Sequence, residues 1–168
     1  MRRILGIAIV PGAAVMASSL ALAATGQGTS RHERHAQTIR LTASTFDSRD
    51  LDLGPTGPTL GDYFVVTEDL FRHGKKVGTD DGTCTITRIE PKNGTPKRGA
   101  LTCATTFVLS QGQIAVYGTR SAELASQKPP NFVLAITGGT GVYRRARGTV
   151  HIVDLNESDS RVTLRLDR

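Results

Sequence analysis

Apolar and polar residues alternate with a period of two in several short segments of this chain. The clearest case lies near the C-terminus, where Val162, Leu164 and Leu166 fall on one face and polar side chains on the other. This spacing is typical of a strand with one buried face. The run 132–136 is apolar throughout, as in a fully buried strand. From these patterns we predict strands at 39–46, 62–71, 77–90, 100–110, 112–117, 132–136, 148–155 and 161–167.

Turn-forming residues separate the predicted strands. Two Gly-Pro pairs mark a loop over 47–60, Asn93-Gly94 is typical of a hairpin, and 121–130 forms a longer polar connection. After the N-terminal region no segment has a convincing helical pattern. We therefore predict an all-β fold, an eight-stranded antiparallel β-barrel. Closure removes exposed strand edges, and the interior of eight strands can either be filled by side chains or hold one small ligand. A β-sandwich is the alternative.

The N-terminus has the pattern of a secretory signal peptide. Arg2 and Arg3 precede an apolar, Ala-rich run, and Ala21-Leu22-Ala23 resembles a cleavage site. We predict a signal peptide over 1–23, a flexible polar segment over 24–37, and one barrel domain over 38–168. The mature protein would then be secreted, with no stable membrane anchor.

Composition narrows the choice of partners. The formal net charge is +6, and loss of Arg2 and Arg3 with the leader lowers it by two. With five Phe, three Tyr and no Trp, the chain has few aromatic platforms for nucleic acid, so we expect no nucleic-acid partner. His32, Glu33 and His35 lie in the polar segment with no further ligand cluster, so we expect no metal site there. We expect no organic cofactor either, and motifs of common hydrolases and nucleotide-binding proteins are absent.

Two cysteines, Cys84 and Cys103, each lie in a Thr-rich segment with a strand pattern. A turn-rich stretch separates the two segments, so antiparallel pairing would bring the cysteines face to face. Export permits a disulfide, which we favour over two free thiols; the register decides between them.

A glycine corner, Gly138-Gly139-Thr140-Gly141, follows the apolar run and precedes three arginines in one short segment. Either the glycines only turn the chain and the arginines are solvated, or the bend forms a site for an anion or polar ligand. No helix is expected after the corner and the glycine order is wrong for a nucleotide loop, so we reject nucleotide binding.

Several blocks together resemble the allene oxide cyclase barrel family and the related dirigent proteins. The similarity runs from about residue 61 to 150, and its most specific block is the GGTG corner followed by Arg144, Ala146, Arg147 and Gly148. The resemblance implies an eight-stranded antiparallel barrel that holds a small hydrophobic molecule. Cys84 matches a pocket cysteine of the cyclases, whereas 39–44 offers no equivalent of their pocket glutamate.

The resemblance to dirigent proteins implies a site that steers coupling or cyclisation of a small hydrophobic or phenolic molecule. Their acidic pair resembles Glu68-Asp69 and their arginine segment resembles Arg144 and Arg147, so these four are the candidate catalytic residues. A carboxyl group beside an arginine can donate a proton next to a polarised oxygen, as acid-assisted ring closure requires. An ion pair at the barrel rim is the structural alternative, and a non-catalytic secreted carrier is the functional one.

Adjacent residues of a strand point to opposite faces, so only one of Glu68 and Asp69 is expected to face the cavity. The candidate ligand contacts are the three tyrosines, Tyr63, Tyr117 and Tyr143. These patterns are compatible with either a monomer or a homo-oligomer.

Overall fold

The structure, a computed structural model, describes residues 36–124 and 131–167. The predicted signal peptide, most of the predicted polar segment and the residues His32, Glu33 and His35 lie outside this part of the chain. The strands are β1 (Gln37–Leu51), β2 (Tyr63–Arg72), β3 (Lys75–Glu90), β4 (Arg98–Leu109), β5 (Gly112–Glu123), β6 (Phe132–Gly139), β7 (Arg147–Asp154) and β8 (Asp159–Asp167), with a short 3-10 helix η1 (Gly141–Tyr143) between β6 and β7.

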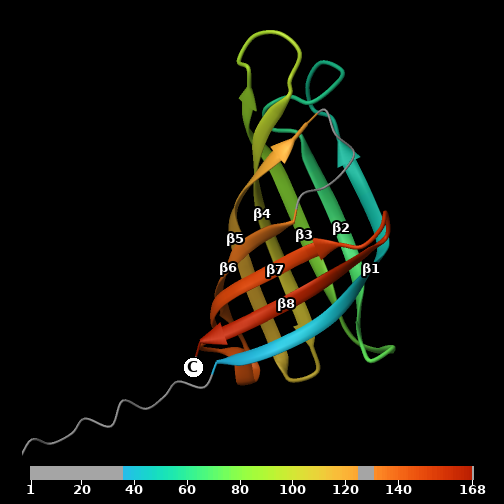
Figure 1. Ribbon diagram of the computed structural model, residues 1–168, viewed down its shortest axis with the longest axis vertical. Coiled ribbons are helices and arrows are strands. Elements are labelled where there is room, and N and C mark those ends of the chain that lie inside the picture. Colours follow the sequence, from blue (N-terminus) through green and yellow to red (C-terminus); the bar gives the residue numbers. More distant parts are fainter. Residues whose placement is uncertain (1–35, 125–130, 168) are drawn as a thin grey trace, which may run out of the picture. The chain divides into compact units, whose positions relative to one another are not determined.

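The eight strands form one closed barrel in sequence order. Each strand pairs antiparallel with the next, and β1 closes the ring by pairing with β8. Every strand pairs with two neighbours along at least part of its length, which confirms the predicted eight-stranded antiparallel barrel. Figure 1 shows the strands running up and down around the ring, so that the connections gather at two ends. We call the end with the tight turns at 73–74 and 110–111 and the bend at 140–146 the closed end, and the end with the loops at 52–62, 91–97 and 155–158 the open end.

The half of the interior beside the closed end is filled by apolar side chains, and we call it the packed half. Phe107, Ile114, Leu70 and Leu164 are fully buried there. The predicted alternation of the last strand is confirmed, since Val162 and its two apolar neighbours in β8 are 0–4% exposed. The other core members around them include Ile39, Leu41, Ala43, Ile136, Tyr143, Ala146 and Val150.

The glycine corner closes this end of the barrel by packing against the β4–β5 turn. Val142 N donates to Gln111 O at 3.0 Å, and Thr140 N donates to Gln113 O at 2.9 Å. Gly141 has a φ of +57°, and a Cβ there would meet Gln111 O at 2.2 Å, so no other residue fits without a shift of the backbone. The corner therefore serves as a tight structural turn, with η1 as a plug.

Two strands are longer than their patterns predict. β1 continues through 47–51, which we expected to be loop, and β5 continues to Glu123 rather than ending at Tyr117. A register shift between Thr45 and Asp47 reverses the alternation in β1, and the pairing with β2 then continues to Leu51 opposite Tyr63. In β5, the second part pairs fully with β4, from Gly118 opposite Cys103 onward.

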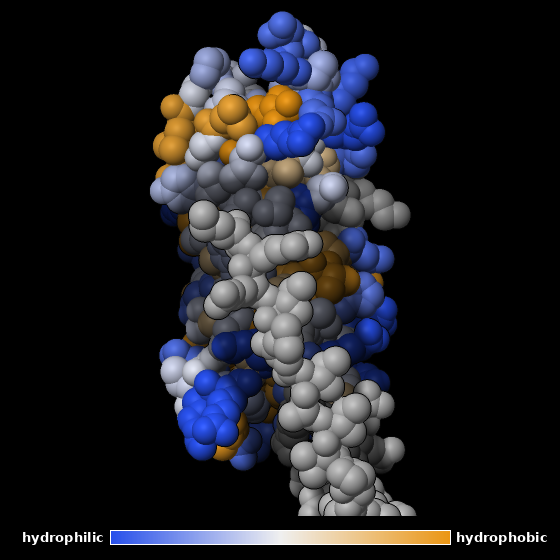
Figure 2. All heavy atoms as spheres, turned by 90° about the vertical axis from the view of Figure 1, so that its left-hand side faces the viewer, coloured by the Kyte–Doolittle hydropathy of each residue, from blue (hydrophilic) through white to orange (hydrophobic). Residues whose placement is uncertain are grey.

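The outer surface mixes polar and apolar side chains. Figure 2 shows the β5–β6 side, where hydrophobic residues lie in separate groups among hydrophilic ones. Tyr117 on β5 and Val133 on β6 are about half exposed, at 53% and 54%. Within the described residues, no helix is long and apolar enough to cross a membrane.

Candidate functional site

The half of the interior beside the open end is hollow. It holds a cavity of about 1150 Å³, at or slightly above the upper end of the usual range for small-molecule sites. Strands β6, β7 and β8 have only 8, 8 and 9 residues, whereas β3 has 16, so the barrel wall is uneven at this end. We call this part of the interior the hollow half, and its floor is the apolar core of the packed half.

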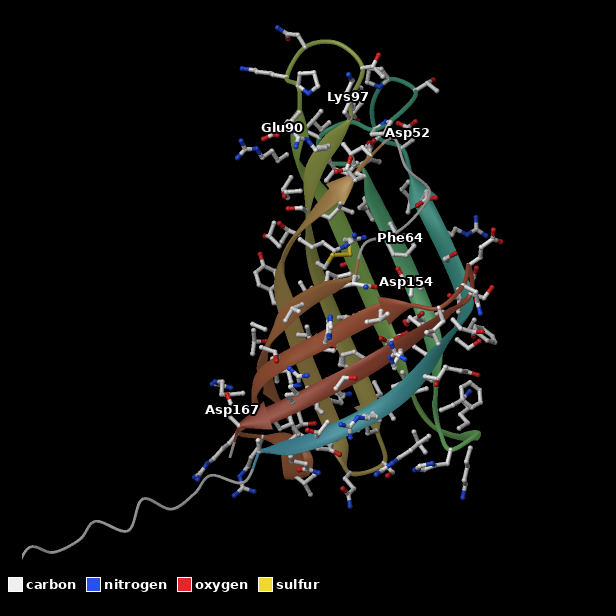
Figure 3. The ribbon with its side chains drawn as sticks, in the orientation of Figure 1. Asp52, Phe64, Glu90, Lys97, Asp154 and Asp167 are labelled. Atoms are coloured by element: carbon white, nitrogen blue, oxygen red, sulfur yellow. A yellow bond between two sulfur atoms is a disulfide. The ribbon has the colours of Figure 1, made fainter. Side chains whose placement is uncertain are left out.

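The apolar part of the cavity wall comes from strands all around the ring. It includes Phe64, Val66, Leu101, Phe132, Leu134 and Ile152, together with the two cysteines. The predicted disulfide is present: Cys84 and Cys103 lie directly opposite one another on β3 and β4, with an S–S distance of 2.05 Å. The bridge thus forms part of the wall, and Figure 3 shows its sulfur atoms between the strands.

Two carboxyl groups lie side by side within the cavity. Glu68 on β2 and Asp80 on β3 are directly opposite in the strand register, so their side chains point to the same face. Both line the cavity, and Asp80 is only 3% exposed. Next to them, Phe107 pairs with Asp80 across β4 and belongs to the apolar floor. The carboxyl pair therefore lies where the polar cavity meets the packed half.

This pair holds a proton well above the acid range in which carboxyl groups normally titrate. Burial raises the pKa of Asp80 to about 8, and the negative charge of Glu68 adds to the effect. Burial likewise raises the pKa of Glu68, while its hydrogen bond with Asp80 opposes the rise. Two carboxyl groups hydrogen-bond to each other only when one carries a proton. With a pKa of about 8, Asp80 keeps its proton at neutral pH and can donate it to a neighbouring oxygen.

An arginine and a third carboxyl group line the cavity from β5 and β7. The Arg120 guanidinium lies over the Phe132 ring, 4.7 Å from its centroid. Burial lowers the pKa of Arg120, and the charge of Asp154 partly opposes this. Burial raises the pKa of Asp154, and Arg120 opposes that shift in turn. Asp154 on β7 and Phe64 on β2 both line the cavity, and both are labelled in Figure 3.

The loop between β1 and β2 forms part of the cavity rim through Pro58. Asp62 fixes this loop, because its carboxylate accepts hydrogen bonds from Leu53 N at 2.9 Å, Thr59 N at 2.7 Å and Thr59 Oγ1 at 2.8 Å. The backbone donors hold the pKa of Asp62 below its ordinary value. A rim held by charge-assisted hydrogen bonds keeps the mouth of the cavity in a defined shape.

Comparison with known proteins assigns the family. The model of the allene oxide cyclase barrel-like domain matches residues 39–164, which is most of the chain. The chain belongs to this family. No curated protein matches the sequence.

Solved structures of similar fold include enzymes and a dirigent protein. A pyocyanin demethylase superposes with a TM-score of 0.67 and 28% identity over 77% of this chain and 99% of its own. A heme-binding cyclase that catalyses a [4 + 2] cycloaddition during neoabyssomicin biosynthesis has a TM-score of 0.66 and 19% identity, covering 82% and 66%. A pterocarpan synthase dirigent protein has a TM-score of 0.52 and 18% identity, covering 80% and 84%. At these lower identities, the cyclase and the dirigent protein show a shared fold alone.

In this member of the allene oxide cyclase barrel-like family, the side chains of the adjacent residues Glu68 and Asp69 point to opposite faces of β2, as expected for neighbours on a strand. Glu68 lines the cavity, whereas Asp69 lies outside and forms an ion pair with Lys76, with an Nζ–Oδ1 distance of 2.6 Å. Of the two, Glu68 is thus the residue that can contact a ligand inside the barrel.

The candidate arginines are not brought to Glu68. Arg144 and Arg147 are exposed beside the glycine corner at the closed end, and neither lines the cavity. Arg147 instead donates to Thr137 O at 2.8 Å and to Ala146 O at 2.7 Å, so it braces the bend. The arginine of the cavity is Arg120, on another strand.

The three candidate tyrosines also lie outside the cavity lining. Tyr117 is exposed on the outer face of β5, while Tyr143 is buried in η1 as part of the core. Tyr63 is half-buried at the start of β2 and pairs with Leu51 and Thr85. The aromatic side chains that line the cavity are Phe64 and Phe132.

Sequence reasoning missed Asp80, Arg120 and Asp154, although the period of two could have found them. Asp80 has the same parity as Cys84 on β3, and Arg120 has the parity of the buried Ile114 and Val116 on β5. Asp154 likewise follows Val150 at even spacing on β7. A charged residue in phase with a buried apolar face is the signal of a polar cavity.

Proposed function

We propose that this chain binds a small, largely apolar conjugated or phenolic molecule and directs its cyclisation or coupling by proton transfer. The observation that carries the proposal is the Glu68–Asp80 pair, a half-buried and a buried carboxyl group that lie opposite one another in the wall of a ligand-sized cavity and whose pKa values are both raised. Perturbed carboxyl groups in a cavity are typical of catalytic acids and bases. The family and its solved structures supply the precedent of barrels that act on small molecules.

In the proposed reaction an internal hydroxyl group of the ligand gives its proton to the carboxylate of the pair as its oxygen attacks the β-carbon of a conjugated ketone. A C–O bond forms as the C=C π bond breaks, and Arg120 stabilises the negative charge that develops on the ketone oxygen of the resulting enolate. The pair then delivers a proton to the α-carbon of the enolate, which gives the ketone product and returns the pair to its starting state. The apolar walls hold the chain of the molecule in the folded shape that ring closure needs.

Ring closure of 2′-hydroxychalcone to flavanone tests the proposal, because the spontaneous product is racemic. We expect the parent protein to give an excess of one enantiomer, and Glu68→Gln and Asp80→Asn each to lose this excess. Asp69→Asn, which changes the neighbouring outward carboxylate, is the matched control and keeps it. Racemic product at the spontaneous rate from a protein that binds the chalcone contradicts the proposal and supports a carrier.

A second candidate function, demethylation of a methylated planar aromatic, is favoured by the 28% identity to pyocyanin demethylase over 99% of that chain. Incubation of the protein with pyocyanin, followed by mass analysis, tests it. Loss of a methyl group from pyocyanin supports this function, and unchanged pyocyanin after incubation with protein that binds it excludes it.

We further propose that the protein acts after export. The basic tip, the apolar run and Ala21-Leu22-Ala23 support a cleaved leader. N-terminal sequencing of exported protein is expected to begin near Ala24. A mature protein that still begins at Met1 contradicts this.

A further inference from the structure

Two buried polar atoms of the cavity have no hydrogen-bond partner among the described residues. One is a donor, Nε of Arg120, and the other is an acceptor, Oδ1 of Asp80. An unpaired buried polar atom is rare in a folded protein, because its lost hydration is not replaced. Both residues line the same cavity, so a ligand that enters it meets both atoms.

The two atoms lie at different depths. Asp80 is directly opposite Phe107, which is opposite Ile114 on β5, so these residues share one hydrogen-bonded row at the floor of the cavity. Arg120 lies further along β5 from Ile114, toward the open end. The cavity therefore presents an acceptor near its floor and a cationic donor nearer its mouth.

Two aromatic side chains line the cavity at and below the level of Arg120. Phe132 stacks under the Arg120 guanidinium, and Phe64 lines the cavity from β2, next to Cys84 in the register. Aromatic rings favour planar, conjugated ligands with which they can stack. Asp154 places a carboxylate near Arg120, so the site does not have the uniform positive charge that a simple anion would need.

We propose that the cavity takes a flat conjugated molecule in one orientation. A hydroxyl or N–H group of the ligand donates to Asp80 near the floor, and a carbonyl or phenolate oxygen accepts from Arg120 nearer the mouth. The ligand is therefore a polar-ended aromatic with donor and acceptor at opposite ends. This inference rests on the proposed function, because it names the substrate class of the same site.

Binding of three fluorescent probes tests the orientation without any need for turnover. 7-Hydroxycoumarin carries a hydroxyl and a carbonyl oxygen at opposite ends. 7-Methoxycoumarin lacks the donor, and 2-naphthol lacks the carbonyl acceptor. Because a probe that lacks either group leaves one buried polar atom of the cavity unpaired, we expect the parent to bind 7-hydroxycoumarin about tenfold more tightly than either of the others.

Two substitutions assign each preference to its residue. Arg120→Met keeps the length of the side chain, and we expect it to lose the preference over 2-naphthol but keep the preference over 7-methoxycoumarin. Asp80→Leu is expected to do the reverse. Asp80→Ala, which also removes the acceptor oxygen but adds no bulk, is expected to lose the same preference and serves if the leucine variant does not fold. Arg161→Met, at an exposed position, and Asp69→Asn, on the outer face of β2, are the matched controls and keep both preferences.

Equal affinity of the parent for all three probes, or no binding of 7-hydroxycoumarin, overturns the inference. So does a folded variant in which one substitution removes both preferences. Stereoselective closure of the chalcone by a protein that does not distinguish the probes leaves the proposed function standing without this inference. Selective binding of 7-hydroxycoumarin without any stereoselective closure supports the inference and removes the proposed catalysis.

Discussion

The packed half and the hollow half of this barrel are built from the same strands but filled in opposite ways. On β5, Ile114 and Val116 face inward near the closed end and are buried in the core, while Arg120 faces inward near the open end and lines the cavity. On β2, Leu70 belongs to the core and Glu68 to the cavity. One strand thus changes from filling the core to lining the cavity within a few residues. Stability and ligand chemistry can be altered separately in such a molecule.

The largest difference between the halves is expected for two phenylalanines. Phe107 is fully buried in the packed half, whereas Phe64 is half-buried on the cavity wall. We expect Phe107→Ala to lower the free energy of unfolding by about 3–5 kcal/mol, because the cavity that it leaves is enclosed by a packed core. Phe64→Ala should cost less than about 2 kcal/mol and instead weaken binding of an aromatic ligand. Urea denaturation measures the free energy of unfolding of the two variants. Equal losses of stability would show that the hollow half is packed in solution.

The disulfide joins two strands at the wall of the hollow half, where Cys103 belongs to the apolar core and Cys84 packs against it. Replacing both Cys84 and Cys103 by Ala is expected to lower the free energy of unfolding by about 3 kcal/mol, on the chain-entropy account for a sequence separation of 19 residues. Reductant should destabilise the parent by a similar amount and leave the double variant unchanged. Non-reducing mass analysis should find both thiols blocked, and freely alkylated cysteines in native protein would contradict the bridge.

A smaller effect, of opposite sign, is expected at Asp80. Its carboxyl faces Glu68 and keeps a proton that the unfolded chain releases, so Asp80→Asn, which is neutral in both states, should raise the free energy of unfolding by about 1–3 kcal/mol at neutral pH. The same variant should lose stereoselective ring closure. A gain in stability with a loss of activity is typical of a residue kept for function.

The pH dependence follows from the raised pKa of Asp80. Unfolded, this carboxyl loses its proton near its ordinary value of 3.8, but folded it keeps the proton until about pH 8. Between these values the folded state binds more protons, so a rise in pH lowers the stability of the parent. Glu68, whose pKa is also raised, contributes in the same direction, and the charge of Asp81 adds to the shift of Asp80. The advantage of Asp80→Asn should therefore grow as pH rises through this window, and a constant difference would contradict the shift.

The sequence predicted the packed half much better than the hollow half, for a physical reason. Alternation of apolar and polar residues marks a strand only where the inner face is apolar, as in Val162, Leu164 and Leu166. In 47–51 and 118–123 the inner positions include Asp50 and Arg120, which line the cavity, so the pattern fades and the strands were predicted too short.

The resemblance to dirigent proteins located one site residue, Glu68, but drew attention to arginines that brace the glycine corner. Nothing local to 144–147 distinguishes an arginine that faces a ligand from one that holds a bend. That distinction depends on which end of the barrel the bend closes, which is a property of the ring of strands. Asp80 and Arg120 line one cavity only because β3, β4 and β5 pair in register, so neither segment alone could predict that both face the same interior.

The smallest effect is expected where the two faces of one strand are compared at neighbouring residues. Asp69 pairs with Lys76 on the outside, where the lysine side chain is 54% exposed, and such surface pairs contribute less than about 1 kcal/mol. Asp69→Asn should therefore lower the free energy of unfolding by no more than this, and the loss should shrink at high salt because the pair is screened. Its ligand affinity should match that of the parent, whereas Glu68→Gln, one residue away, should change ligand chemistry without a large loss of stability. If Asp69→Asn altered the product and Glu68→Gln did not, the outer face of β2 would be the functional one. That result would contradict the assignment of ligand chemistry to the inner face of the barrel.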